Sequence, residues 1–257
     1  MNIYTKNLNR IEFLVTLACT GKCKHCSEGS HNANGRFIDG SVAADIVQKI
    51  TSKYKISSLM TFGGEPLLYW EQVCKIHEAA YKAGIGKRQL ITNGYFTKDM
   101  DKMRFAVKEL TKSGIGEIAL SADAFHQETI PLEIVKEFAL TVKKEGIMVK
   151  VHPAWIKSKD AVNPYNNRTR EIIKEFNKMG IEPSPGNVIF PEGNALIYLK
   201  DYFDTNENVI NPYIENPEDI HTISIGPDGN VLGDNIYKTD ILDILSGYKP
   251  CQDKSGA

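Results

Sequence analysis

Ile11-Glu12-Phe13-Leu14-Val15-Thr16-Leu17 is an apolar run, and Cys19-Thr20-Gly21-Lys22-Cys23-Lys24-His25-Cys26 follows it directly. Such a run predicts a buried strand, which places the three cysteines on the loop at its carboxyl end. Soft thiolates this close together can share one inorganic centre, either zinc or an iron–sulfur cluster. Both centres usually take four protein ligands, and no fourth cysteine is nearby. A three-cysteine site leaves one metal position open to an exchangeable ligand.

Beyond this loop, segments with helical periodicity alternate with short apolar runs as far as residue 190. The expected strands are 57–62, 89–92, 117–121, 148–152 and 187–190, and the expected helices lie at 41–54, 71–83, 103–110, 132–142 and 172–179. Glycines at 84, 114, 146 and 180 are suited to ending four of these helices. The alternation predicts an α/β fold with a parallel sheet, arranged as a partial (β/α)6 TIM-type barrel.

Residues suited to ligand binding follow five of the expected strands. They are the three cysteines after the first strand, Gly63-Gly64-Glu65 after the second, Thr92-Asn93-Gly94 after the third, Ser121 and Asp123 after the fourth, and His152 after the fifth. Ligands bind at the carboxyl ends of the strands in barrels and in open α/β sheets. We therefore expect one pocket to collect these residues.

The chain changes character after residue 190. Residues 206–218 are rich in Asn, Pro and Glu and predict a loop. The runs 222–225 and 230–232 flank Gly226-Pro227-Asp228-Gly229, which predicts a β-hairpin, and 239–245 predicts a short helix. We expect residues 1–190 to form the barrel and residues 191–257 to form a small α+β appendage packed on it.

Composition excludes several classes of protein. The hydrophobic fraction of 42%, the charged fraction of 25% and the formal net charge of -1 describe an ordinary globular protein with no sign of nucleic-acid or membrane binding. Residues 1–8 are too polar for a signal peptide. Three of the five cysteines are clustered, which fits metal binding in a reducing compartment better than a disulfide framework. We expect a cytoplasmic protein.

Two motifs carry a resemblance to a known family. The spacing Cys-x3-Cys-x2-Cys, followed after the next strand by Gly63-Gly64-Glu65-Pro66, resembles the radical S-adenosylmethionine (SAM) enzymes from about residue 10 to residue 195. His25 fills a position that is commonly aromatic in this family. The resemblance implies one [4Fe-4S] cluster on Cys19, Cys23 and Cys26, with SAM on the fourth iron. It also implies reductive cleavage of SAM to a 5′-deoxyadenosyl radical, with electrons from a flavodoxin or a ferredoxin.

The same resemblance assigns the contacts to SAM. The backbone at Gly63 and Gly64 is expected to meet the methionine amino group, with Glu65 in support. The short polar side chains of Asn93, Ser121 and Asp123 suit ribose and carboxylate contacts, and Asn187-Val188 is expected beside adenine. Thr92, His152 and His25 complete the expected cofactor surround.

The end of the chain resembles the SPASM-type extension of peptide-modifying radical SAM enzymes, on Pro191-Glu192-Gly193-Asn194-Ala195 and on the segment 225–231. This implies a peptide or protein substrate. The positions of the auxiliary-cluster cysteines read Leu232-Gly233-Asp234-Asn235 here, so a single cluster is expected, and Asn194 replaces a commonly basic residue. Cys251 is most simply an inert thiol, and the alternative is a hydrogen-atom donor to a substrate radical.

Three functions remain open. The leading hypothesis is a radical SAM maturase for a ribosomally made peptide. The first alternative is a glycyl-radical-enzyme activase, although no activase signature is present beyond the shared motifs. The second alternative is a non-catalytic zinc or iron–sulfur protein, with His25 or His31 completing a zinc site.

Overall fold

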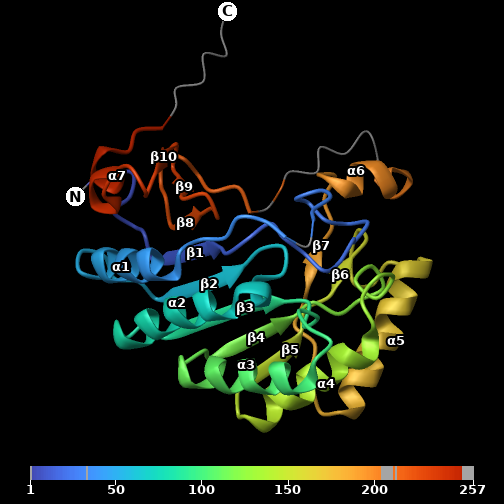
Figure 1. Cartoon of the computed structure of the whole chain (residues 1–257). Coiled ribbons are helices and arrows are strands. Elements are labelled where there is room, and N and C mark those ends of the chain that lie inside the picture. Colours follow the sequence, from blue (N-terminus) through green and yellow to red (C-terminus); the bar gives the residue numbers. More distant parts are fainter. Residues whose placement is uncertain (1, 33, 204–210, 212, 251–257) are drawn as a thin grey trace, which may run out of the picture.

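The computed structural model describes residues 2–32, 34–203, 211 and 213–250. Five parallel strands lie side by side in chain order, namely β1 (Arg10–Leu14), β2 (Ser58–Phe62), β3 (Lys87–Thr92), β4 (Glu117–Leu120) and β5 (Met148–Val151). Successive strands are joined through α1 (Gly40–Thr51), α2 (Trp70–Lys82, preceded by the 3-10 helix η1, Pro66–Tyr69), α3 (Met100–Lys112) and α4 (Leu132–Lys144). Figure 1 shows these helices and α5 (Pro164–Lys178) wrapped around one side of the strands. The predicted alternation and the α/β barrel class are confirmed.

The local sequence explains where the helices begin and end. Asp39 caps α1 by accepting hydrogen bonds from the backbone of the first turn, and Asp99 does the same for α3. Four helices are followed by a glycine with positive φ, as the sequence predicts: Gly84 (76°), Gly114 (79°), Gly146 (83°) and Gly180 (67°). The apolar faces between these ends pack on the sheet, whose interior includes the fully buried Phe13 and Leu90.

The main sheet ends at β5 on one side. After Val151 the chain continues through Pro153 into β6 (Ala154–Trp155), which pairs in parallel with β7 (Asn187–Val188) as a separate two-stranded sheet. The expected sixth strand, 187–190, is therefore shorter than predicted and lies outside the main sheet. Prolines at 153, 183 and 185 lack the N–H that a continuous ladder needs. They account for the interruption.

The sixth strand of the main sheet comes from the end of the chain. β8 (Thr222–Ile225) pairs in parallel with β1, from Arg10↔Thr222 to Phe13↔Ile225. The predicted hairpin of 222–225 with 230–232 is wrong, because β9 (Asn230–Val231) pairs instead with β10 (Asp234–Asn235). The open edge of β1 offers unpaired backbone groups, and β8 satisfies them while burying Ile223 and Ile225.

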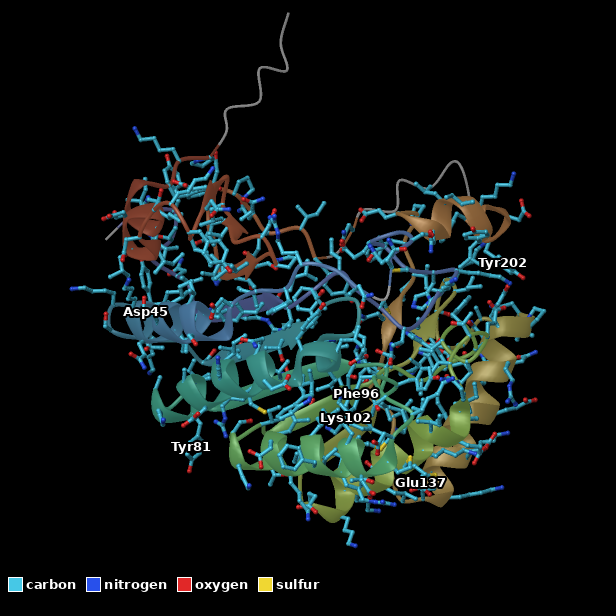
Figure 2. The ribbon with its side chains drawn as sticks, viewed as in Figure 1. Asp45, Tyr81, Phe96, Lys102, Glu137 and Tyr202 are labelled. Carbon is cyan, nitrogen blue, oxygen red and sulfur yellow. The ribbon has the colours of Figure 1, made fainter. Side chains whose placement is uncertain are left out.

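Two short helices complete the described chain. The predicted helix near the end is present as α7 (Ile241–Gly247), and Cys251 lies outside the described residues. α6 (Asn194–Tyr198) and the 3-10 helix η2 (Lys200–Tyr202) follow β7. Tyr202, labelled in Figure 2, packs edge-on against Tyr165 of α5 with ring centroids 5.9 Å apart. This contact belongs to a second small core that joins α6 to α5 and β6, formed by Phe125, Ala154, Ile156, Ile189, Ala195 and Leu199. No helix in the described part of the chain is both long enough and apolar enough to cross a membrane.

Candidate functional site

The three clustered cysteines lie on the loop between β1 and α1, at the carboxyl end of the sheet. All three are free thiols; Cys23 is buried, and Cys19 and Cys26 are partly buried. The loop is fixed by its own backbone: Cys19 N–H donates to Asn32 O over 3.0 Å, and Cys26 N–H donates to Cys23 O over 3.3 Å. Three thiols are thus presented on one ordered loop, as predicted.

Burial makes these thiols poor thiolates when no cation is present. It raises the pKa of Cys19 to about 11, with a further increase from the nearby Glu65 carboxylate. Burial also raises the pKa of Cys23, where Asp123 adds to the effect, and that of Cys26. Metal ligation requires the deprotonated form. A cationic centre with a high affinity for sulfur would supply the missing stabilisation.

The spacing of the thiols can be compared with what a single metal ion requires. A single zinc ion with Zn–S bonds of about 2.3 Å holds its sulfurs about 3.8 Å apart. Among the described residues, the only three ligand atoms within 4.8 Å of one another belong to His25, Asp123 and His126, and no cysteine is among them. The thiols are therefore more widely spread than one zinc ion requires. A cluster in which each cysteine binds a different iron does not require the sulfurs to lie so close together.

Gly63 and Gly64 bring the end of β2 against the cysteine loop. Gly64 N–H donates to Thr16 O and Glu65 N–H donates to Ala18 O, both over 2.8 Å. A Cβ on Gly63 would lie 2.3 Å from Thr16 O, and a Cβ on Gly64 would lie 2.3 Å from Ala18 O. The Cβ directions of both glycines therefore face backbone of the segment that leads into the cysteine loop. Close approach requires glycine here, as the sequence suggests. The group that approaches the Cβ side of both glycines is the backbone of residues 16–18 and not a ligand.

Glu65 joins the ends of β2 and β3. Its Oε1 accepts hydrogen bonds from Leu67 N–H over 2.9 Å and from the Thr92 hydroxyl over 2.6 Å, and its Oε2 accepts one from Asn93 N–H over 2.8 Å. The side chain is fully buried. Burial raises its pKa to about 7 in spite of these three donors. The predicted residues Glu65, Thr92 and Asn93 are therefore one connected unit.

Asn93 connects this unit to the cysteines. Its Nδ2 lies 3.7 Å from Cys19 Sγ and 3.2 Å from Thr20 Oγ1, and it donates to both. Its Oδ1 accepts from Tyr95 N–H over 2.8 Å, which fixes the orientation of the amide. The ends of β1, β2 and β3 thus meet at one place, as predicted.

Asp123 is the centre of a second hydrogen-bonded group beyond β4. Its buried carboxylate accepts from Phe125 N–H, His126 N–H and Ala154 N–H, and from the His126 ring at Nδ1, over 2.9 to 3.0 Å. Burial alone would raise the pKa of Asp123, but the charge and hydrogen bonds of His126 outweigh burial and lower it. Its carboxylate oxygens are already engaged, so the close approach of His25, Asp123 and His126 is explained without a metal ion.

His25 links the second group to the cysteine loop. Its ring lies 4.7 Å from that of His126 and 5.0 Å from that of Phe125, between ring centroids. Burial lowers its pKa to about 4, so the ring is neutral at pH 7. Its Nδ1 is buried with no partner among the described residues, as is Nε2 of Gln127. Two polar atoms that lack partners lie in the part of the chain where a ligand was expected.

The remaining predicted residues extend from β4 to β7. Ser121 N–H donates to Thr92 O over 2.8 Å, which places Ser121 beside the Glu65 unit. His152 N–H donates to Leu120 O. Its ring Nδ1 is hydrogen-bonded to Ser184 Oγ over 2.8 Å. Asn187 and Val188 form β7, and Val188 is 44% exposed.

Asn194 is a further residue of the site, which the sequence marks only as a replacement for a commonly basic residue of the SPASM-type extension. Its buried side chain donates from Nδ2 to Cys23 O over 3.0 Å, and its N–H donates to Cys26 O over 2.9 Å. The signal that marks it is the preceding Gly193, whose φ is 53°. A glycine with positive φ followed by a buried amide indicates a tight approach, but the partner lies some 170 residues away in sequence and cannot be read locally.

Comparisons with known proteins agree with this geometry. The model of the Radical SAM superfamily matches residues 13–190, which is more than half of the chain. The chain therefore belongs to the radical SAM superfamily. Its cofactors are accordingly a [4Fe-4S] cluster and SAM, and the chain provides a fitting donor set: three free thiols on one loop, next to a strand-end surround of short polar side chains.

Individual relatives are more distant. The "Probable GTP 3′,8-cyclase" of Methanocaldococcus jannaschii is 23% identical over 125 residues, covering 49% of this chain and 40% of that protein. Two solved structures share the fold: native anSMEcpe with bound AdoMet (TM-score 0.54, 16% identity, 91% of this chain and 76% of that chain) and HydG, a maturase of the [FeFe]-hydrogenase (TM-score 0.52, 16% identity, 84% of this chain and 48% of that chain). At these identities they show the shared fold.

Proposed function

We propose that this protein is an enzyme that cleaves SAM reductively and uses the product to abstract a hydrogen atom from a peptide. The observation that carries the proposal is the set of three free thiols on one loop beside the Glu65 and Asn93 unit, in a chain that belongs to the radical SAM superfamily. When bound, the cluster and SAM supply the electron transfer and the 5′-deoxyadenosyl radical.

The chain's own residues bind and orient these groups. Cys19, Cys23 and Cys26 are proposed to hold three irons, which leaves the fourth for the amino and carboxylate groups of SAM. Asn93, whose amide already faces Cys19, is proposed to contact SAM directly. Glu65 keeps Asn93 in place through its backbone N–H. Its own oxygens are taken by chain donors, so its proposed role is support.

The far side of the pocket is proposed to orient the nucleoside of SAM. Ser121, Asp123, His152 and the β7 residues Asn187 and Val188 follow the next strand ends around the barrel. Asp123 is proposed to act through His25 and His126, because its four accepted hydrogen bonds leave it little capacity for a ligand. The buried side chains of Ser121 and Asp123 are proposed to help keep water away from a reactive species.

A peptide substrate is supported by the end of the chain. α6 is bonded directly to the cysteine loop and exposes Leu196, Ile197 and Tyr198 to solvent by 54%, 65% and 55%. Apolar side chains exposed beside a reactive site favour a partner with apolar side chains of its own. A structure of anSMEcpe that shares this fold (TM-score 0.54) holds AdoMet and the Kp18Cys peptide. We propose flavodoxin or ferredoxin as the electron donor.

Anaerobic reconstitution tests the enzymatic part of the proposal. The protein should take up about four iron and four sulfide per chain, and should release 5′-deoxyadenosine when reduced with SAM. Replacing Cys19, Cys23 or Cys26 by Ala should abolish that release, while Cys74→Ala, at a free cysteine on α2, should not. One zinc per chain and no SAM cleavage would contradict the proposal.

The substrate is tested separately. Co-expression with short peptides encoded beside the gene should give a peptide whose mass is changed only when Cys23 is intact. A nucleotide substrate is the second candidate, because the curated relative is named as a probable GTP 3′,8-cyclase. Consumption of GTP by the reconstituted protein, with no change in any peptide, would favour that candidate.

A further inference from the structure

Asn194, the first residue of α6, contacts the cysteine loop through four hydrogen bonds. Its N–H donates to Cys26 O over 2.9 Å, its Nδ2 donates to Cys23 O over 3.0 Å and to Gly29 O over 3.3 Å, and its Oδ1 accepts from the Ser30 hydroxyl over 3.2 Å. The residue is only 5% exposed. The backbone N–H, the side-chain Nδ2 and the side-chain Oδ1 of Asn194 are thus all bonded to the segment 23–30.

The neighbouring glycine makes this approach possible. Gly193 has φ of 53°, and a Cβ there would lie 2.2 Å from Ser27 O and 2.5 Å from Cys26 O. Any other residue would collide with the backbone of the cysteine loop, because these contacts are to main-chain atoms that cannot rotate away. Two consecutive residues of the link into α6 are therefore fitted to the loop.

Two of the hydrogen bonds from Asn194 are accepted by the backbone carbonyls of Cys23 and Cys26 themselves. Cys23 O also accepts from Cys26 N–H over 3.3 Å, and Cys26 O also accepts from Gly29 N–H over 3.2 Å. Each carbonyl thus closes a local turn and receives a second donor from Asn194. The second donor holds the turn in a single form, which fixes the direction of the thiols at Cys23 and Cys26.

We propose that Asn194 is a positioning residue that clamps the cysteine loop in the form that accepts the cluster. The inference rests on the proposed cluster site and goes beyond it, because it makes the segment after the barrel part of that site. The clamp also connects the exposed apolar face of α6 to the backbone of the cluster ligands. Partners that orient metal ligands change metal affinity by about 10- to 100-fold when removed.

The chain offers a matched control at Asn166 on α5. This asparagine is fully buried and has the same pattern of bonds: Nδ2 donates to the carbonyls of Ile156, Ser158 and Ala161, and Oδ1 accepts from Ile156 N–H. Its loop holds no cysteine. Replacement of Asn166 should therefore disturb a loop to a similar extent without reaching the cluster.

The experiment compares Asn194→Ala and Asn194→Asp with Asn166→Ala and Asn166→Asp in the full chain. The first substitution removes the donors, and the second turns them into acceptors that face carbonyl oxygens. In the reconstituted protein, both Asn194 variants should lose iron to a chelator about tenfold faster than the wild type and show an altered electron paramagnetic resonance spectrum. In the metal-free protein, their Cys23 and Cys26 should react with iodoacetamide several-fold faster. The Asn166 variants should match the wild type in all three readouts.

Wild-type rates and spectra in both Asn194 variants would overturn the proposal, as would equal changes in the Asn166 variants. If neither Asn194 variant folds, Ser30→Ala removes one bond of the clamp at an exposed residue and should give a smaller change in the same direction; no change in that variant would also overturn the proposal. Failure of the wild type itself to bind a cluster would refute the proposed function. The alkylation of the metal-free protein would still decide whether Asn194 clamps the loop.

Discussion

The segments that follow β2 and β4 each bury one carboxyl group, and the pKa values of the two groups are shifted in opposite directions. Glu65 accepts three hydrogen bonds and has a pKa raised to about 7 by burial. Asp123 accepts four hydrogen bonds, one of them from the His126 ring, and its pKa is lowered. Both side chains are fully buried. The difference is the imidazole beside Asp123.

The comparison shows that neutral donors alone do not offset the burial of a carboxylate in this protein. Burial raises the pKa of Glu65 to about 7 in spite of three donors, while the charge and hydrogen bonds of His126 lower the pKa of Asp123 in spite of burial. The end of β4 is therefore a fixed anchor for the turn that carries His126 and for β6. The end of β2, beside Cys19, holds a carboxyl group whose pKa is raised to about 7 by burial.

The largest expected effect is a loss of stability when Asp123 is replaced. Asp123→Asn puts an amide N–H against donors that need an acceptor, and it removes the charge that His126 faces. The free energy of unfolding of the metal-free protein should fall by about 3 to 5 kcal/mol in urea titrations at pH 7. Asp99→Asn is the control, since Asp99 also accepts from two backbone N–H groups but is exposed. It should cost less than about 1 kcal/mol, and equal costs would remove the distinction between the two carboxylates.

The next effect is the pH dependence of Glu65. Folding raises its pKa from 4.5 to about 7, so the folded state binds more protons than the unfolded state between these values. Ionisation of Glu65 therefore opposes folding as pH rises. The stability of the wild type relative to Glu65→Gln should fall by about 3 kcal/mol from pH 4.5 to pH 7.5.

Urea titrations of the metal-free proteins across this range check that slope. The difference between wild type and Asp123→Asn should be nearly constant over this range, because the contribution of Asp123 is fully present above its ordinary pKa of 3.8 and is lost only as pH falls below it. A difference between wild type and Glu65→Gln that does not vary with pH would show that Glu65 titrates normally in the folded protein.

The smallest effect tests one donor to Glu65. Thr92→Val removes the hydroxyl that donates to Glu65 Oε1 over 2.6 Å while nearly keeping the shape of the side chain. We expect a loss of about 1 to 2 kcal/mol, larger at pH 8 than at pH 5, because the hydroxyl stabilises the ionised form. Thr141→Val on α4, whose hydroxyl donates only within its own helix, should change stability by about 0.5 kcal/mol or less. The Thr92 hydroxyl also accepts from Gly94 N–H over 2.9 Å, so a pH-independent loss at Thr92 would assign the effect to packing and to that lost bond, and not to Glu65.

The parts of the fold that depend on neighbouring residues could be predicted from the sequence. Helix periodicity located α1 to α4, and the glycines after them have the positive φ that was expected. The partner of β8 could not be predicted, because a local turn signal does not show that the edge of β1 is open. The prolines near β6 and β7 were visible in the sequence and could have indicated the interruption of the sixth strand.

The site divides in the same way. The cysteine spacing and Gly63-Gly64-Glu65 identified one end of the site, and the structure brings Glu65, Thr92 and Asn93 together beside Cys19. The pair Asp123 and His126 lies three residues apart and could have been recognised as a local hydrogen-bonded unit. The contacts of Asn194 with the cysteine loop span 164 residues or more and depend on the tertiary fold.

The central claim is that Cys19, Cys23 and Cys26 hold one cluster whose remaining iron binds SAM. The most direct test is the electron paramagnetic resonance spectrum of the reduced, reconstituted protein with and without SAM. The spectrum should be that of one [4Fe-4S] cluster per chain, should change when SAM is added, and should be absent in Cys23→Ala but present in Cys74→Ala. A cluster signal that SAM leaves unchanged, or a signal that survives Cys23→Ala, would contradict the claim.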